Sequence, residues 1–306
     1  MTAPAVVEVE PARFGDVIAH VRSIDDAARA IAGHAALGDA VWLDLEHPGA
    51  DSAGFLAGDL AYGHVARVDT PTERRWSLGV VVAPEARELG VRPALVAAAV
   101  AHVAARGGGL VTLWVLGAGP ADEAELAAAG WRADRELYEM RVALPVAARP
   151  KWPTGIHLRH FEPGRDEKSW LAVNNRAFAG HAEQGNWTLA TLERRESEPW
   201  FDPELFLLAA DDGGLLGFNW LKVHDANDVD SALGEIYVIG VDPRGQGSGV
   251  GRALAIAGLE ALYERRVTTG MLFCAADNGP ALRLYKGLGF EVHRVDRAYE
   301  LEVRPQ

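Results

Sequence analysis

The sequence predicts an α/β protein made of two tandem copies of one module, each with a mixed sheet. Three observations carry this prediction: the chain repeats itself at a constant shift, strands alternate with helices in each copy, and a glycine-containing segment joins a strand to a helix at the same place in both. With 306 residues, of which 49% are hydrophobic, the chain is long enough for two domains, each with its own core.

The repeat aligns "VVVAPEARELG" (80–90) with "IGVDPRGQGSG" (239–249), and the same shift of 159 residues carries "AAAGW" (127–131) onto "KGLGF" (286–290) without a gap. Between the copies, "PVAARPKWPTG" (145–155) contains three prolines, which oppose both helix and sheet pairing. We therefore expect a first domain over residues 1–146 and a second over residues 154–306.

The elements of the second copy follow from hydrophobic periodicity. Strands are expected at "IHLRHF" (156–161), "LFLLAA" (205–210), "LLGFNWLKV" (215–223), "LGEIYVIGV" (233–241) and "GMLFCA" (270–275), with "FEVHRV" (290–295) and "AYELEV" (298–303) closing the sheet. Helices are expected at 169–179, 249–265 and 278–287. The glycine-rich segment thus lies between the central strand and the longest helix.

Composition narrows the possible partners. A formal net charge of −13 argues against nucleic-acid and anionic-membrane binding, and the sequence shows neither a membrane-length apolar run nor a signal-peptide pattern. We expect a cytoplasmic monomer. The single cysteine, Cys274, lies in the apolar run "MLFCA", where a buried small hydrophobe is a better interpretation than a nucleophile.

The segment "VDPRGQGSGVGRAL" (241–254) has four glycines in seven residues before a helix start. A P-loop is excluded because no lysine follows the glycines, and G-x-G-x-x-G fails because Val250 and Arg252 occupy its final positions. The pattern that fits is Gln246-x-x-Gly249-x-Gly251. Unpaired amides at a helix start suit a pyrophosphate, and the alternative is a turn without a ligand.

This pattern after Val-x-Pro resembles the acetyl-CoA loop of the GCN5-related N-acetyltransferases (GNAT), and "NGPALRLYKGLGF" (278–290) resembles their second motif. The tandem arrangement, with "VNNRAFAGHAEQGNW" (173–187), is similar to the mycothiol synthase family. The resemblance covers nearly all of the second half, but only the loop and strand ends of the first. It implies two GNAT domains, with acetyl-CoA as co-substrate and the cysteinyl amine of cysteinyl-glucosaminyl-inositol as acceptor.

The resemblance also implies which residues bind acetyl-CoA. In the second copy they are Ile239, Gly240, Val241, Gln246, Gly247, Ser248, Gly249, Val250, Gly251, Arg252, Asn278, Gly279, Pro280, Ala281, Leu282 and Arg283. In the first copy Val80, Val81 and Val82 are further candidate contacts.

Acetyl transfer to an amine needs a base, a stabilised oxyanion and a proton for the departing thiolate. A period of two along 233–241 places Glu235, Tyr237, Ile239 and Val241 on one face, so that Glu235 can take the amine proton above the loop. Tyr285, on the following helix, can protonate the thiolate. The amide of Ile239 or a neighbour is the expected oxyanion donor. The alternatives are a solvated surface charge for Glu235 and ordinary helix packing for Tyr285.

The repeat provides an internal control. The shift places Trp76 opposite Glu235, Leu126 opposite Tyr285, Gly119 opposite Asn278 and Arg92 opposite Gly251. The first copy therefore lacks both proton-transfer groups, and we expect a single active site, in the second domain. Arg92 can either crowd a pyrophosphate or pair with it.

For the acceptor, the resemblance implies Asp39, Glu183 and Lys222, while Phe273 stands where a tyrosine is expected. The aromatic rings of Trp187, Trp200 and Trp220 can stack on a sugar, but core packing is the favoured interpretation. No metal is expected, because His157 and His160 would point to opposite faces of a strand.

Two other functions remain open from the sequence. The protein can acetylate another small-molecule amine, such as an aminoglycoside or an amino acid. It can also be a non-catalytic sensor of acetyl-CoA.

Overall fold

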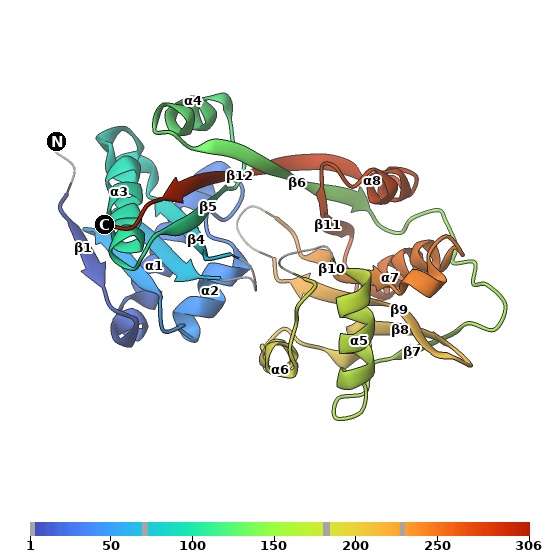
Figure 1. Ribbon diagram of the computed structural model, residues 1–306. Helices are drawn as coiled ribbons and strands as arrows, with labels where there is room; N and C mark the ends of the chain where they lie inside the picture. Colours follow the sequence, from blue (N-terminus) through green and yellow to red (C-terminus); the bar gives the residue numbers. More distant parts are fainter. Residues whose placement is uncertain (1–3, 69–72, 180–183, 227–229) are drawn as a thin grey trace. The chain divides into compact units, whose positions relative to one another are not determined.

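The computed structural model describes residues 4–68, 73–179, 184–226 and 230–306 and divides into two compact units (Figure 1). The first unit contains residues 1–137 and 294–306, and the second contains residues 138–293. Each unit has a mostly antiparallel sheet with one internal parallel pair and helices on both faces, so the predicted mixed α/β class is confirmed. None of the helices in the described ranges is long and apolar enough to cross a lipid bilayer.

The first unit has the strand order β1-β2-β3-β4-β5-β12. Its elements are β1 (Val6–Val9), η1 (Pro11–Arg13), α1 (Phe14–Ala32), α2 (Asp39–Glu46), β2 (Ala53–Ala57), β3 (Ala61–Arg67), β4 (Arg75–Val82), η2 (Pro84–Leu89), α3 (Val91–Ala105), β5 (Gly109–Val115), α4 (Pro120–Ala128) and the start of β6 (Arg132–Ala143). Helix α3 packs on one face around Trp76 and Leu95, whereas α1 and α2 cover the other around Phe14 and Tyr62.

The second unit has the order β6-β11-β10-β9-β8-β7. Its elements are the end of β6, β7 (His157–His160), α5 (Glu167–Ala177), α6 (Leu189–Glu196), η3 (Pro203–Leu205), β8 (Phe206–Asp211), β9 (Gly214–His224), β10 (Leu233–Val241), η4 (Pro243–Gly245), α7 (Val250–Glu264), β11 (Thr269–Ala275), α8 (Gly279–Lys286) and the start of β12 (Glu291–Val303). Helix α7 packs on one face and α5 on the other. The predicted elements are present within about two residues, except that the two strands expected at 290–295 and 298–303 form the single strand β12. Helix α6, which Thr188 caps, was not predicted.

The last strand differs from the sequence expectation. Residues 298–303 were expected to close the sheet of their own copy, but residues 297–303 of β12 pair antiparallel with β5 in the first unit, where Tyr299 is buried. Conversely, Met140 and Val142 of β6 are buried in the core of the second unit. The expected domains 1–146 and 154–306 follow chain order, whereas the compact units exchange their final strands. An alternating strand pattern does not specify the sheet that the strand joins.

Candidate active site

Strands β10 and β11 pair over only part of their length. The parallel ladder joins residues 233–236 to residues 269–272, after which β10 continues to Val241 and β11 to Ala275. On its other side β10 stays paired with β9 as far as Val241. The end of β10 therefore has one backbone edge that no described strand covers. Three predicted coenzyme contacts, Ile239, Gly240 and Val241, lie along it.

The glycine loop (residues 245–251) follows β10 directly. Gly247 and Gly249 have φ angles of 76° and 95°, and a Cβ added to either would meet nothing within 4 Å. Backbone conformation rather than space therefore requires glycine at both positions. The first helical bond of α7 runs from the Ala253 N–H to the Gly249 carbonyl, so the amides of residues 250–252 precede it. Together with the helix dipole, these amides form an anion site of the kind that binds phosphates.

The side chains of the loop agree with this assignment. Gln246, Ser248 and Arg252 are exposed. The Ser248 hydroxyl donates to the Gly245 carbonyl at 2.6 Å, which holds the turn, whereas the Val250 side chain is buried in the core and leaves only its backbone for a ligand.

A buried carboxylate anchors the start of this loop. Asp242 accepts hydrogen bonds from the Arg244 amide at 3.1 Å and from Arg176 Nε of α5 at 2.8 Å. Burial alone would raise the pKa of Asp242, but these bonds and the charge of Arg176 hold its pKa below the usual value. The anchor therefore stays ionised at neutral pH.

Helix α8 supplies a second helix start in the same unit. Asn278 is its N-cap, because Asn278 Oδ1 accepts from the Ala281 N–H at 3.2 Å. The other predicted coenzyme contacts, Gly279, Pro280, Ala281, Leu282 and Arg283, belong to the first turns of this helix, where Arg283 is exposed.

A β-bulge at Tyr237 decides which face of the sheet Glu235 occupies. Glu235 lies opposite Lys222 of β9, and the register shifts at Tyr237. Ile239 and Val241 consequently pack with the α7 core, whereas Glu235 shares the opposite face with Lys222. The expectation that Glu235, Tyr237, Ile239 and Val241 share one face is therefore wrong, because the extra residue of the bulge interrupts the period of two.

The face that carries Glu235 combines charge with aromatic rings. Glu235 is 6% exposed, so it is not a solvated surface charge. Lys222 Nζ lies 4.9 Å from the centre of the Trp200 ring and 5.8 Å from that of Tyr237, within cation–π distance. This face can hold a polar ligand against rings.

The tryptophans mostly serve the core. Trp187 and Trp220 are buried in the cluster that packs under α5, as the favoured interpretation predicted. Trp200 is only partly buried and carries the contact with Lys222.

Sequence reasoning missed one residue of this face. His224, the last residue of β9, lies with its Nε2 atom 2.7 Å from Glu235 Oε2. A signal was present, because His224 follows Lys222 by two residues and must project from the same face of the strand.

Tyr285 lies on α8 and is 6% exposed, with its ring centre 5.7 Å from that of Phe290. Burial, with a smaller effect of Cys274, raises the pKa of the Tyr285 hydroxyl. Tyr285 therefore stays protonated at neutral pH, as a proton donor must. Cys274 itself is buried, as predicted, and burial raises the pKa of its thiol to about 11.

The other predicted acceptor contacts lie in several places. Phe273 is 39% exposed on β11, just beyond the last pair with β10. Asp39 is the first residue of α2 in the first unit, and Glu183 lies outside the described residues. His157 and His160 are both exposed on β7, and the described ranges contain no His, Cys, Asp and Glu group suited to a metal.

The first unit keeps the strand separation but not the bulge. The ladder of β4 with β5 covers residues 75–78, and β4 continues to Val82, so Val80, Val81 and Val82 lie beyond it. The pairing of β4 with β3 runs without a register shift. Trp76, the counterpart of Glu235, is therefore buried in the α3 core, where its Nε1 donates to the Gly108 carbonyl.

The helix starts of the first unit are occupied by charged side chains. Arg92, the counterpart of Gly251, bonds to Asp122 at 2.5 Å and to Glu125 at 3.1 Å, both on α4. Asp122 also accepts from the amide of Gly119, the counterpart of Asn278. Leu126, the counterpart of Tyr285, is buried. Arg92 is thus already neutralised by carboxylates.

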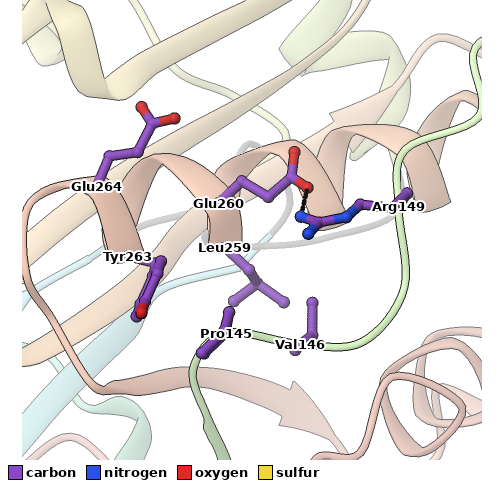
Figure 2. A pocket seen from close by; sticks show the side chains of 7 residues that line it. All are labelled: Pro145, Val146, Arg149, Leu259, Glu260, Tyr263 and Glu264. Atoms are coloured by element: carbon purple, nitrogen blue, oxygen red, sulfur yellow. Dashed lines mark hydrogen bonds and ion pairs between the residues drawn. The ribbon is translucent and has the colours of Figure 1, made fainter.

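A surface pocket of the second unit is unrelated to this site. It is lined by residues of the segment after β6 and of α7, namely Pro145, Val146, Arg149, Leu259, Glu260, Tyr263 and Glu264 (Figure 2). Arg149 pairs there with Glu260 at 2.7 Å. The remaining acidic side chain, Glu264, makes the pocket unsuited to a diphosphate.

The separated strands, the glycine loop and the α7 start define a GCN5-related N-acetyltransferase. Residues 168–290 match the acetyltransferase (GNAT) family, whose members use acetyl-CoA. Two solved structures share the tandem fold. A tandem GNAT protein from the clavulanic acid biosynthesis pathway has a TM-score of 0.74 and 18% identity, covering 99% of both chains. A GNAT from Sphaerobacter thermophilus has a TM-score of 0.72 and 23% identity, covering 99% of this chain and 98% of that one.

Sequence relatives specify the family further. The mycothiol acetyltransferase of Thermobispora bispora is 42% identical over 91% of this chain and 94% of its own length. The mycothiol acetyltransferase of Thermomonospora curvata is 40% identical over 92% of this chain and 93% of its own length. The chain belongs to the mycothiol acetyltransferase family. Its identification as a tandem GNAT acyltransferase that uses acetyl-CoA is confirmed.

Proposed function

We propose that the second unit transfers the acetyl group of acetyl-CoA to the cysteinyl amine of cysteinyl-glucosaminyl-inositol, giving mycothiol and CoA. The observation that carries the proposal is the bulge at Tyr237, which turns Glu235 away from the α7 core and toward Lys222, beside the separated strands. The names of the relatives identify the product class.

The coenzyme is held by the backbone in this proposal. The diphosphate lies at the amides of the glycine loop and the first turn of α7. Arg252 in that turn and Arg283 on α8 are exposed cations that can pair with it. The pantetheine arm runs along the free edge of residues 239–241, where its amides can replace the missing strand partner. The first turn of α8 completes the contacts.

Glu235 and Tyr285 carry the proton transfers. The amine nitrogen attacks the thioester carbonyl carbon, the C–N bond forms and the C–S bond breaks, and the amine proton moves to Glu235, directly or through water. An α-amine has a pKa of about 7.7–8.0 and is already partly deprotonated at neutral pH, so a carboxylate suffices as its base. Tyr285 gives its proton to the CoA thiolate, and a free amide near Ile239 binds the oxyanion.

The acceptor lies over Lys222, Trp200 and Glu235 in this proposal. Hydroxyl-rich sugar and inositol rings suit a charged group beside aromatic faces. We propose Glu183 as a further contact. Phe273 supplies a ring but no hydroxyl, so it contributes packing only.

The first unit is proposed to be non-catalytic. Trp76 and Leu126 replace the two proton-transfer residues. The regular β4 strand directs Trp76 into the α3 core, whereas β10 directs Glu235 to the face opposite α7. Val80, Val81 and Val82 offer the same kind of strand edge as β10, but Arg92 is already paired with carboxylates at the helix start.

Turnover of cysteinyl-glucosaminyl-inositol, compared with a panel of aminoglycosides and amino acids, tests the proposal. Release of CoA thiol is the measurement. Glu235→Gln is expected to lower kcat by about 10²–10³-fold and Tyr285→Phe by about 10–10²-fold, both with little change in CoA affinity. A preference for a panel amine would reassign the acceptor. Absence of any turnover in the wild type, with CoA still bound, would indicate a sensor.

A further inference from the structure

The contact between His224 and Glu235 links a buried carboxylate to the surface. His224 Nε2 and Glu235 Oε2 are 2.7 Å apart, a short distance for a nitrogen–oxygen hydrogen bond. The His224 side chain is 33% exposed, whereas that of Glu235 is 8% exposed. The two residues come from adjacent antiparallel strands, β9 and β10, so the backbone fixes their spacing.

Hydrogen-bond chemistry sets the direction of this contact. A base must be unprotonated, so in the form of Glu235 that the proposed function requires, His224 Nε2–H is the donor and Glu235 Oε2 the acceptor. One carboxylate oxygen is then occupied, and the other, Oε1, is left for the proton of the acceptor amine.

We propose that His224 is a positioning residue for Glu235: its Nε2–H fixes the orientation of the carboxylate, so that Oε1 serves as the base. The proposal rests on the proposed function, in which Glu235 accepts the amine proton. It adds a residue that the loop motif does not contain.

The His224–Glu235 contact has charged neighbours on adjacent elements. Lys222 lies opposite Glu235 in the ladder, and its Nζ atom lies over the rings of Trp200 and Tyr237. Arg195 of α6 also lies over Tyr237, with its guanidinium carbon 6.0 Å from the ring centre. Asp225, beside His224 in the chain, is exposed. Met271 of β11, the other cross-strand partner of Glu235, is uncharged.

The test compares His224→Phe, His224→Asn and His224→Gln. Phe has no donor, and the Asn amide is too short to reach Oε2, whereas the Gln amide nitrogen can take the place of Nε2. The Phe and Asn variants are expected to lower kcat by about 10–10²-fold with little change in the KM of either substrate, because the carboxylate is no longer held in the orientation that accepts the amine proton. The Gln variant should recover most of the lost kcat.

Matched controls separate positioning from folding. His157→Phe changes an exposed histidine of the same unit, on β7, and should leave kcat unchanged. CoA affinity and the melting temperature should be preserved in the Asn and Gln variants, so this pair decides the matter if the Phe variant does not fold.

The possible outcomes distinguish the two proposals. If wild type lacks turnover, the proposed function fails. If wild type is active and Glu235→Gln is not, but the Asn variant keeps the wild-type kcat, or the Gln variant behaves like the Asn variant, the role of His224 is wrong.

Discussion

Glu196, at the end of α6, shows how burial changes the chemistry of a single residue. Its Oε1 atom is buried and has no hydrogen-bond partner within the described ranges. Burial, followed by the charges of Glu167 and Glu193, raises the pKa of Glu196 from 4.5 to about 7. The folded state therefore binds a proton that the unfolded state releases in this interval. The stability that this proton contributes is complete below pH 4.5 and is lost as the pH rises through 7.

Glu196→Gln should consequently stabilise the protein more at pH 8.5 than at pH 5, because the amide is never charged. After allowance for partial solvent screening, we expect the two gains in unfolding free energy to differ by about 1–2 kcal/mol. Denaturant unfolding at both pH values measures it. Glu264→Gln, at the exposed end of α7, is the control and should show no such difference. Equal gains for Glu196→Gln at both pH values would contradict the prediction.

At the scale of elements, helix α7 is fixed to β9 by a buried side chain. Asn219 Nδ2 donates to the Leu254 carbonyl at 2.9 Å, and Asn219 is fully buried. A Cβ added to Gly258 would lie 2.2 Å from that nitrogen and 3.0 Å from Leu221 Cδ2. Gly258 therefore leaves the space in which strand and helix meet. Since the start of α7 carries the glycine loop, this contact also helps to set the loop's position.

Gly258→Ala is expected to reverse the usual effect of this change. In a helix interior alanine normally stabilises by about 0.5–1 kcal/mol relative to glycine. Here we expect a loss of about 1–3 kcal/mol in unfolding free energy, because the methyl group overpacks the site, together with a raised KM for acetyl-CoA. Thermal and denaturant unfolding measure the first effect. In an Asn219→Ala background the loss should shrink, and a stabilised Gly258→Ala single variant would refute the argument.

The parts of these elements that sequence could predict were local. Alternation indicated the strand at 233–241, and the glycines indicated both the start of α7 and the end of α8. The bulge at Tyr237 was not predictable, because it arises from the pairing of β10 with β9. The motif singled out Glu235 as a candidate base. The face of the sheet that Glu235 occupies and its contact with His224 depend on the same strand pairing, so the sequence could not predict either.

At the scale of the whole molecule, the repeat predicted two modules but not the exchange of their final strands. Each copy ends in a strand of similar pattern, and sequence alternation is equally compatible with either sheet. The core under α7 includes Met140, Val142 and Leu144, which precede the proline-rich segment (145–155), and Val146, near its start. The compact unit thus begins before the point at which composition changes.

This arrangement predicts the behaviour of fragments. A fragment of residues 154–306 lacks those four core side chains, each worth about 1.5–3 kcal/mol when fully buried, against a typical domain stability of about 5–15 kcal/mol. It also leaves residues 297–303 without β5. Residues 138–293 should therefore melt cooperatively, whereas 154–306 should not, as circular dichroism would measure. Cooperative melting of 154–306 at the same or a higher temperature would contradict this reading.

The number of coenzyme sites per chain follows from the difference between the two helix starts. In the second unit the amides of residues 250–252 face a loop of glycines, whereas in the first Arg92 already bonds to Asp122 and Glu125. A diphosphate entering there would have to displace carboxylates in a chain whose net charge is −13. Calorimetric titration with CoA should therefore give one tight site per chain.

Gly251→Arg, which gives the second unit the residue of the first, should weaken that site at least about tenfold, because the side chain lacks the carboxylate partners of Arg92 and blocks the close approach of the backbone. Arg92→Ala is the matched control and should change neither the stoichiometry nor turnover. Two equivalent sites in the wild type would show that the ion pairs of the first unit do not exclude the coenzyme.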